Sequence, residues 1–174
     1  SSDSDVTAVT YGGQAMTQAG EIMATVGWRT RYEIWYINEA GIAAAGSGTF
    51  NLTWNNAATR YPQYTSLMLQ YVDQATPIND VETATTGVYT TGVTITNVLG
   101  VEDGITIVGG ASGGPGIITF TGGLTTSANQ ADAQGTTRMG YLQIGSGNTG
   151  KLNFNVNSTV SQRLVGIGIH VNPQ

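Results

Sequence analysis

Apolar and polar residues alternate with a period of two along most of this chain, and this pattern limits what it can fold into. Successive side chains of a strand point to opposite faces, so the alternation predicts strands with one buried face. The composition agrees, because 25 Gly and 26 Thr among 174 residues disfavour helices, and Thr favours strands. The alternating runs are residues 6–11, 22–28, 31–36, 50–54, 67–71, 88–99, 105–108, 117–121, 139–144, 152–156 and 164–171.

These ten or eleven short runs are separated by turn-forming residues. Helical turns are expected only at residues 40–45 and 127–133, so no helix is long enough to connect parallel strands. This order is typical of an all-β antiparallel sandwich of the jelly-roll or immunoglobulin-like kind. No linker or change of composition divides residues 14–174, which we expect to form one domain.

The charges and the rare residue types exclude several functions. Six Lys and Arg stand against eleven Asp and Glu without a basic cluster, which argues against nucleic-acid binding. No apolar run approaches the roughly 18 residues that span a bilayer. The absence of Cys excludes a disulfide framework, and a single His excludes a metal site of several histidines. We therefore expect neither an enzyme nor a cofactor.

The single histidine, His170, lies in a strand whose other face is apolar. No acid and nucleophile stand beside it in a recognisable arrangement, so a structural role is expected. The glycine-rich residues 109–116 lack the Lys and the following helix of a phosphate-binding loop, and predict a flexible hairpin tip.

Two acidic segments could bind Ca²⁺ through carboxylate oxygens, namely residues 80–82 and 102–104. Neither has the Asp-x-Asp-x-Asp spacing of a calcium loop, so solvated turns are the expected interpretation, and no metal site is predicted.

Several features predict an exported protein. The chain opens with Ser1-Ser2-Asp3 and no Met, as a mature protein does after removal of a leader peptide. Its low charge is typical of secreted and cell-surface β proteins. Asn51 and Asn157 begin glycosylation sequons on outward-facing strand positions, although two such matches are near chance in a chain rich in Thr and Asn.

The aromatic residues suggest an alternative function. Trp28 and Trp54 share faces with aliphatic residues and are expected in the core, whereas Trp35 is the better candidate for an exposed aromatic. Sugar rings stack on aromatic faces, so a carbohydrate-binding or adhesive module stays open as a second hypothesis. A viral jelly-roll capsid or fibre protein is a third.

The N-terminal segment, residues 1–13, is the feature that most favours a specific function. An acidic, polar leader is followed by an alternating strand and then by Gly12-Gly13, which we interpret as a hinge. Such a strand could stay in its own domain, or it could insert into the sheet of a neighbouring copy. The predicted donor side chains are Val6, Ala8, Val9 and Tyr11. The bare strand face at Gly166 and Gly168 is the suggested wall of the acceptor groove.

The arm at residues 6–11, the strands Phe50-Asn-Leu-Thr-Trp54 and Leu152-Asn-Phe-Asn-Val156, and the closing Val165-Gly-Ile-Gly-Ile-His-Val171 resemble secreted jelly-roll subunits of the TasA/camelysin type, including archaeal bundling pilins and threads. The resemblance implies a structural subunit that passes its N-terminal strand to the next copy, forming a homopolymeric pilus or matrix fibre. Its implied roles are adhesion, cell–cell contact or biofilm formation, with other cells or surface glycans as possible partners. No catalytic residue is carried over, because no His-Glu-x-x-His motif is present.

Overall fold

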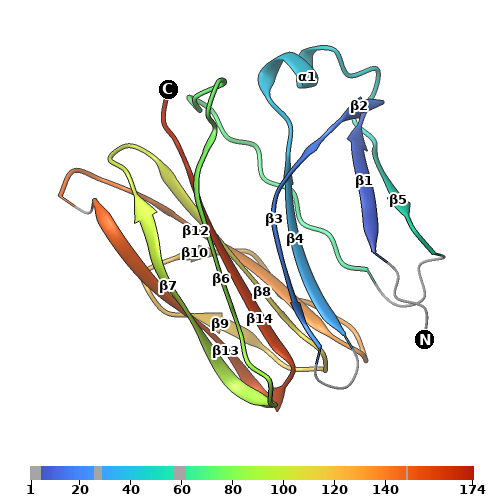
Figure 1. The fold of residues 1–174 in the computed structure, drawn as a ribbon, viewed down its shortest axis with the longest axis vertical. Coiled ribbons are helices and arrows are strands. Elements are labelled where there is room, and N and C mark those ends of the chain that lie inside the picture. The colour runs from blue at the N-terminus through green and yellow to red at the C-terminus, as the bar shows by residue number, and fades with distance from the viewer. Residues whose placement is uncertain (1–4, 26–28, 57–61, 148) are drawn as a thin grey trace.

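The structure is a computed structural model that describes residues 5–25, 29–56, 62–147 and 149–174. It is nearly all β, which confirms the predicted all-β sandwich (Figure 1). The elements are β1 (Val6–Tyr11), β2 (Gln14–Ala15), β3 (Thr17–Ala24), β4 (Thr30–Tyr36), α1 (Glu39–Ala43), β5 (Phe50–Trp54), β6 (Ile78–Thr85), β7 (Thr90–Gly100), β8 (Ile105–Ser112), β9 (Ile118–Phe120), β10 (Thr125–Thr126), β11 (Gln130–Ala131), β12 (Thr136–Gln143), β13 (Gly150–Gln162) and β14 (Leu164–Val171).

The strands form four antiparallel sheets. The largest has the order β10-β12-β8-β14-β6, with β11 also pairing with β12. One of its faces packs against the sheet β7-β13-β9, and its other face packs against the pair β3-β4. The fourth sheet, β2-β1-β5, lies to one side of these layers (Figure 1). We call this fourth sheet the leaf, and the three other sheets the body.

Strand β14 is the centre of the body, since all eight of its residues are buried and both of its edges are paired. On one face its glycines allow the sheet β7-β13-β9 to approach closely. A Cβ at Gly166 would lie 2.8 Å from Val156, and a Cβ at Gly168 would lie 2.8 Å from Val98. The core between these sheets includes Phe154 and Ile95, which are almost completely buried.

The other face of the large sheet carries a second apolar cluster. Ile167 and Ile169 of β14 pack there with Ile34 of β4. Tyr32 of β4 lies over Gly109 of β8, where a Cβ would come within 2.3 Å of the ring. Burial raises the pKa of Tyr32 to about 12, so its phenol is protonated at physiological pH.

The structure corrects four local predictions. Residues 109–112 continue strand β8 and form no flexible tip, because their glycines accommodate side chains from both neighbouring layers. Asp80 and Glu82 lie on β6, a strand that the sequence pattern did not reveal. Residues 67–71 form no strand and end in a bend at Tyr71, whose φ is +58°, and residues 127–133 form no helix. The predicted helical turn at residues 40–45 is confirmed as α1.

His170 lies on β14 in a buried, hydrogen-bonded environment. Its side chain is fully buried. Nε2 accepts a hydrogen bond from the backbone N–H of Val101 at 3.1 Å, and Nδ1 lies 3.1 Å from the Thr106 hydroxyl. Burial lowers the pKa of His170, although the carboxylate of Asp80 acts in the opposite direction. The neutral ring therefore holds the turn between β7 and β8 to the sheet.

The lowered pKa of His170 predicts an acid-sensitive fold. The unfolded chain binds this proton more tightly, so the free energy of unfolding falls as the pH drops below about 6.5. Replacing the ring in His170→Leu removes the acceptor for Val101, and we expect a loss of about 1–3 kcal/mol at pH 7.5. Between pH 7 and pH 5 the free energy of unfolding should fall less in His170→Leu than in the native chain, as measured by urea denaturation.

The matched control is Thr106→Val, which removes the hydroxyl partner and retains the imidazole. It should keep the acid sensitivity of the native chain. Equal pH slopes for the native chain and His170→Leu would contradict the assignment.

Candidate functional site

The leaf contains the predicted donor strand. Strand β1 pairs along its length with β5 of the same chain, with Val9 opposite Leu52 and Tyr11 opposite Phe50. The apolar side chains of both strands face the body, whereas Asn51 and Thr53 alternate to the exposed outer face. The rings of Tyr11 and Phe50 are in contact, with 4.9 Å between centroids. The leaf is thus a small amphipathic sheet with an aromatic inner face.

Gly12 and Gly13 connect β1 to β2 by a tight two-residue turn. Their φ angles are +55° and +88°, and Tyr11 is the register partner of Gln14. Positive φ at both central positions is typical of a type I′ hairpin, which favours glycine. A Cβ at Gly12 would lie 2.4 Å from the Ser47 carbonyl oxygen. The diglycine is therefore an ordered turn in this structure, and its role as a hinge stays a prediction.

A groove with a volume of about 2120 Å³ separates the leaf from the body. This volume exceeds the roughly 300–1,000 Å³ of ordinary small-molecule pockets. Sheets that pack face to face normally fill the space between them with side chains. Here the predicted donor residues Val6, Val9 and Tyr11 line the groove without filling it, whereas Ala8 is exposed outside it. The leaf therefore covers the body incompletely.

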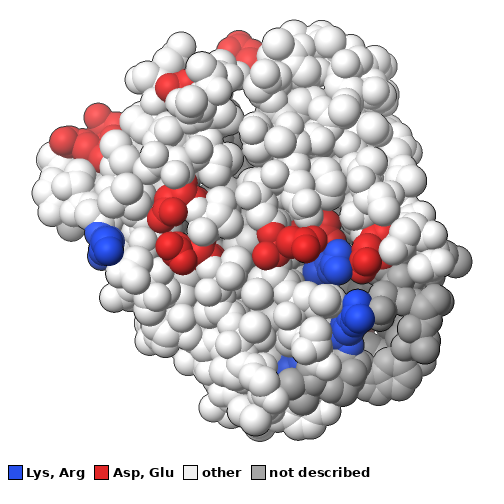
Figure 2. Space-filling view, in the orientation of Figure 1, with Lys and Arg blue, Asp and Glu red and all other residues white. Residues whose placement is uncertain are grey.

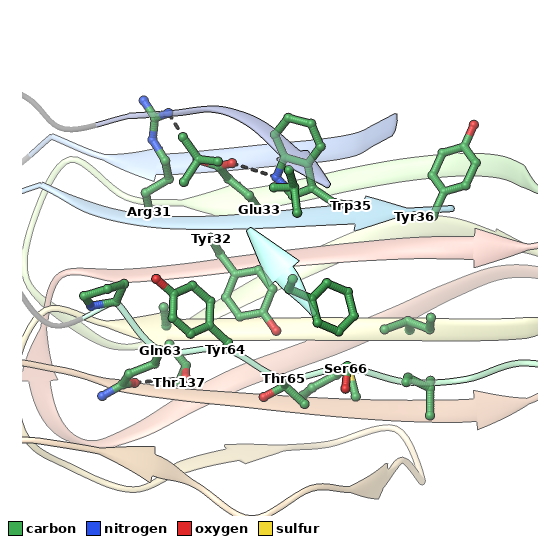
Figure 3. Close-up of a pocket in the computed structure, with 18 of the residues that line it drawn as sticks. Arg31, Tyr32, Glu33, Trp35, Tyr36, Gln63, Tyr64, Thr65, Ser66 and Thr137 are labelled. Carbon is green, nitrogen blue, oxygen red and sulfur yellow. Dashed lines mark hydrogen bonds and ion pairs between the residues drawn. The ribbon is translucent and has the colours of Figure 1, made fainter. Parts of the chain in front are cut away.

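The groove runs between β4 and residues 62–72, of which only Tyr71 and Val72 pair with other described backbone, at Gln174 and Pro173. Strand β4 pairs with β3 on one side and, among the described residues, with no strand on the other. Residues 62–72, which we call the connecting segment, also line the groove. Figure 3 shows Tyr32 pointing from β4 toward the connecting segment, near Tyr64, while Arg31 and Trp35 project from the opposite face of β4.

An ion pair between Arg31 and Asp5 links the start of the leaf to the body. Arg31 Nη2 of β4 lies 2.8 Å from Asp5 Oδ1, directly before β1. Asp5 also exchanges backbone and side-chain hydrogen bonds with Asn55 after β5. The same guanidinium contacts Glu21 at 3.4 Å and Glu33 at 3.3 Å. This cluster is notable because most of the face in Figure 2 is uncharged.

A second arginine lies at the same end of the groove. The Arg163 side chain donates hydrogen bonds to the Thr30 hydroxyl and the Gly113 carbonyl, and lies 6.0 Å from the centroid of the Tyr89 ring. The residue is only 9 % exposed. Within the described part of the chain no carboxylate forms an ion pair with it. A buried guanidinium without a carboxylate is costly, so this end of the groove favours an anionic group.

The other predicted site residues lie in different places. Gly166 and Gly168 face the body's own core, and β14 has no free edge, so the groove uses the opposite face of β14 through Ile169 and Val171. Trp54 lines the groove, not a closed core.

Among the remaining predicted residues, Trp35 is half-buried and donates a hydrogen bond to Glu33 at 2.9 Å. Trp28 and residues 1–4 of the N-terminal segment lie outside the described residues. Asn51 is exposed, and Asn157 is half-buried beside Gly92.

Within residues 5–25, 29–56, 62–147 and 149–174, no group of three His, Cys, Asp or Glu is arranged to hold a metal ion. No helix in these ranges is long and apolar enough to cross a membrane. No protein-family model, curated protein or solved structure matches the chain. The groove and its borders are the main candidate functional site of the described residues.

The ion pair between Asp5 and Arg31 should hold β1 in place. Because both side chains are partly exposed, we expect it to contribute at most about 1 kcal/mol. Asp5→Asn should therefore accelerate amide hydrogen exchange in residues 6–11 by up to about fivefold, without changing exchange in β14. Added salt should have a similar effect on the native chain.

Glu21→Gln is the matched control, because it removes another carboxylate from Arg31 without touching the leaf. Equal acceleration in both variants, or none in Asp5→Asn, would show that the ion pair does not restrain the arm.

Proposed function

We propose that this chain is a non-catalytic structural subunit that polymerises by exchanging its N-terminal strand with a neighbouring copy. The observation that carries the proposal is the large groove beside β1, whose apolar side chains line it without filling it. In the isolated chain β1 pairs with β5, and this state corresponds to a subunit before assembly. Exchange would detach β1 and leave space for the arm of another copy.

The incomplete burial of the leaf supports this proposal. Val6 and Tyr11 are only half-buried, and Phe50 is 46 % exposed although it faces the groove. Full burial of each such side chain contributes about 1.5–3 kcal/mol. An occupied groove would recover part of this free energy, which favours the assembled state over the isolated subunit.

The sequence adds support for an exported fibre. The low charge and the resemblance to TasA/camelysin-type subunits both favour a secreted protein at the cell surface, where such fibres mediate adhesion or biofilm formation. Head-to-tail exchange of a strand does not close on itself and therefore gives an open filament.

Deletion of residues 1–11 tests the proposal. The truncated chain should stay folded, because the core around β14 contains no residue of the leaf. It should form no filaments in negative-stain micrographs under conditions in which the full chain does. A peptide of residues 1–11 should also inhibit assembly of the full chain, whereas the same peptide with Val9→Asp should not. Normal filaments from the truncated chain would refute strand exchange.

A second function is favoured by the aromatic residues of the groove. Trp35, Tyr36 and Tyr64 all line it, and sugar rings stack on such side chains (Figure 3). A carbohydrate-binding module would stay monomeric at high concentration and bind glycans on an array. Trp35→Ala should then abolish glycan binding without loss of fold. Glycan binding that survives in Trp35→Ala would remove the support for this alternative.

A further inference from the structure

We infer that the arm of a second copy binds between β4 and the connecting segment, and forms backbone hydrogen bonds with both. This inference rests on the proposed function and specifies where the exchanged strand lies. It differs from a simple swap, in which the incoming arm would replace β1 beside β5.

The connecting segment has the properties of an unprotected strand edge. No backbone–backbone hydrogen bond joins residues 62–70 to the rest of the described chain. Residues 62–72 contain no charged side chain, and Tyr64, Met68 and Tyr71 are 58 %, 72 % and 79 % exposed. Exposed edges are normally protected by charges, bulges or a covering element. An uncharged edge without such protection is a template for another strand.

The facing border of the groove is also an open edge. Strand β4 uses one edge for β3, and all of its residues except Ile34 line the groove. Tyr32 and Ile34 pack on the large sheet together with Leu69 of the connecting segment. A strand placed between the two edges would join β3, β4 and the connecting segment into one continuous layer over the large sheet.

The chemistry of the groove favours the arm as its occupant. A peptide strand offers the backbone donors and acceptors that the two open edges need, which a small molecule does not. The groove is lined by apolar residues such as Ile107 and Met139, which suits Val6, Val9 and Tyr11. These three side chains already line the same groove from the leaf.

Charge sets the direction of the incoming arm. In the arm, the acidic residues Asp3 and Asp5 precede the strand. In the groove, Arg163 and Arg31 lie at the end where β4 begins. Arg163 is buried and contacts only neutral groups among the described residues. An arm with its acidic end at these arginines would run parallel to β4 and would place Ala8 near the middle of the connecting segment.

The absence of Cys allows a direct test by disulfide formation. Chains carrying Ala8→Cys are mixed with chains carrying Ser66→Cys, assembled into filaments and oxidised. The two cysteines are on different chains, so every mixed disulfide joins two subunits. The matched control replaces Ser66→Cys by Thr53→Cys, since Thr53 is the register partner of residue 8 on β5. We expect several-fold more mixed dimer with Ser66→Cys than with Thr53→Cys.

The outcomes separate this inference from the proposed function. Filaments that cross-link through Thr53→Cys, and not through Ser66→Cys, would leave strand exchange intact but overturn the inferred acceptor site. If the full chain forms no filaments, the proposed function and this inference both fail.

A proline variant gives an independent test. Ser66→Pro removes one backbone N–H from the connecting segment, for which no described residue provides an acceptor. The variant should fold like the native chain but assemble about tenfold more slowly, a factor that corresponds to about 1.4 kcal/mol. Ser146→Pro, in the exposed turn before Gly147, is the matched control and should assemble normally. An unchanged assembly rate in Ser66→Pro would overturn the inferred pairing.

Discussion

The structure depends on one fully buried strand, β14, which has to be covered on both faces. Its glycine-bearing face is covered well, because Gly166 and Gly168 let Val156 and Val98 approach the sheet closely. Its other face carries Ile167 and Ile169, whose apolar surface also has to be removed from water. Two neighbouring strands, β8 and β6, pair with both of its edges. The sheet β7-β13-β9 covers the first face, and the pair β3-β4 covers the second.

The two faces of the large sheet are covered to different extents, and the proposed function follows from this difference. On one side the sheet β7-β13-β9 closes a dense core. On the other side, among the described residues, β3, β4 and the connecting segment lie on the sheet, and a groove stays open beside the leaf. Domains normally close both faces with side chains of their own chain. A chain that leaves one side open, and has a short amphipathic strand beside the opening, has the components for completion by another copy.

Much of the fold could be predicted from the sequence, because alternation directly reflects the pleat of a strand. Residues 50–54 and 164–171 were predicted with the bounds that the structure has. Strand β6 was missed because Asp80 and Glu82 suggested a solvated turn, although both are half-buried on an edge strand, where Asp80 accepts a hydrogen bond from the Leu99 backbone N–H. Residues 67–71 have the pattern of a strand but form none, because no described strand pairs with them, which alternation alone does not reveal. The side chains proposed to act as donors stand out by their alternating pattern, whereas the groove, its borders and the environment of Arg163 depend on contacts between distant segments.

The central claim is that each copy is completed by the arm of another, and cryo-electron microscopy of the native assembly tests it most directly. We expect a filament in which density for residues 1–11, N-terminal to the Gly12-Gly13 turn, leaves its own subunit and enters the groove of the adjacent one, beside β4. A map in which every arm lies against its own β5, or a preparation that contains only monomers, would contradict it.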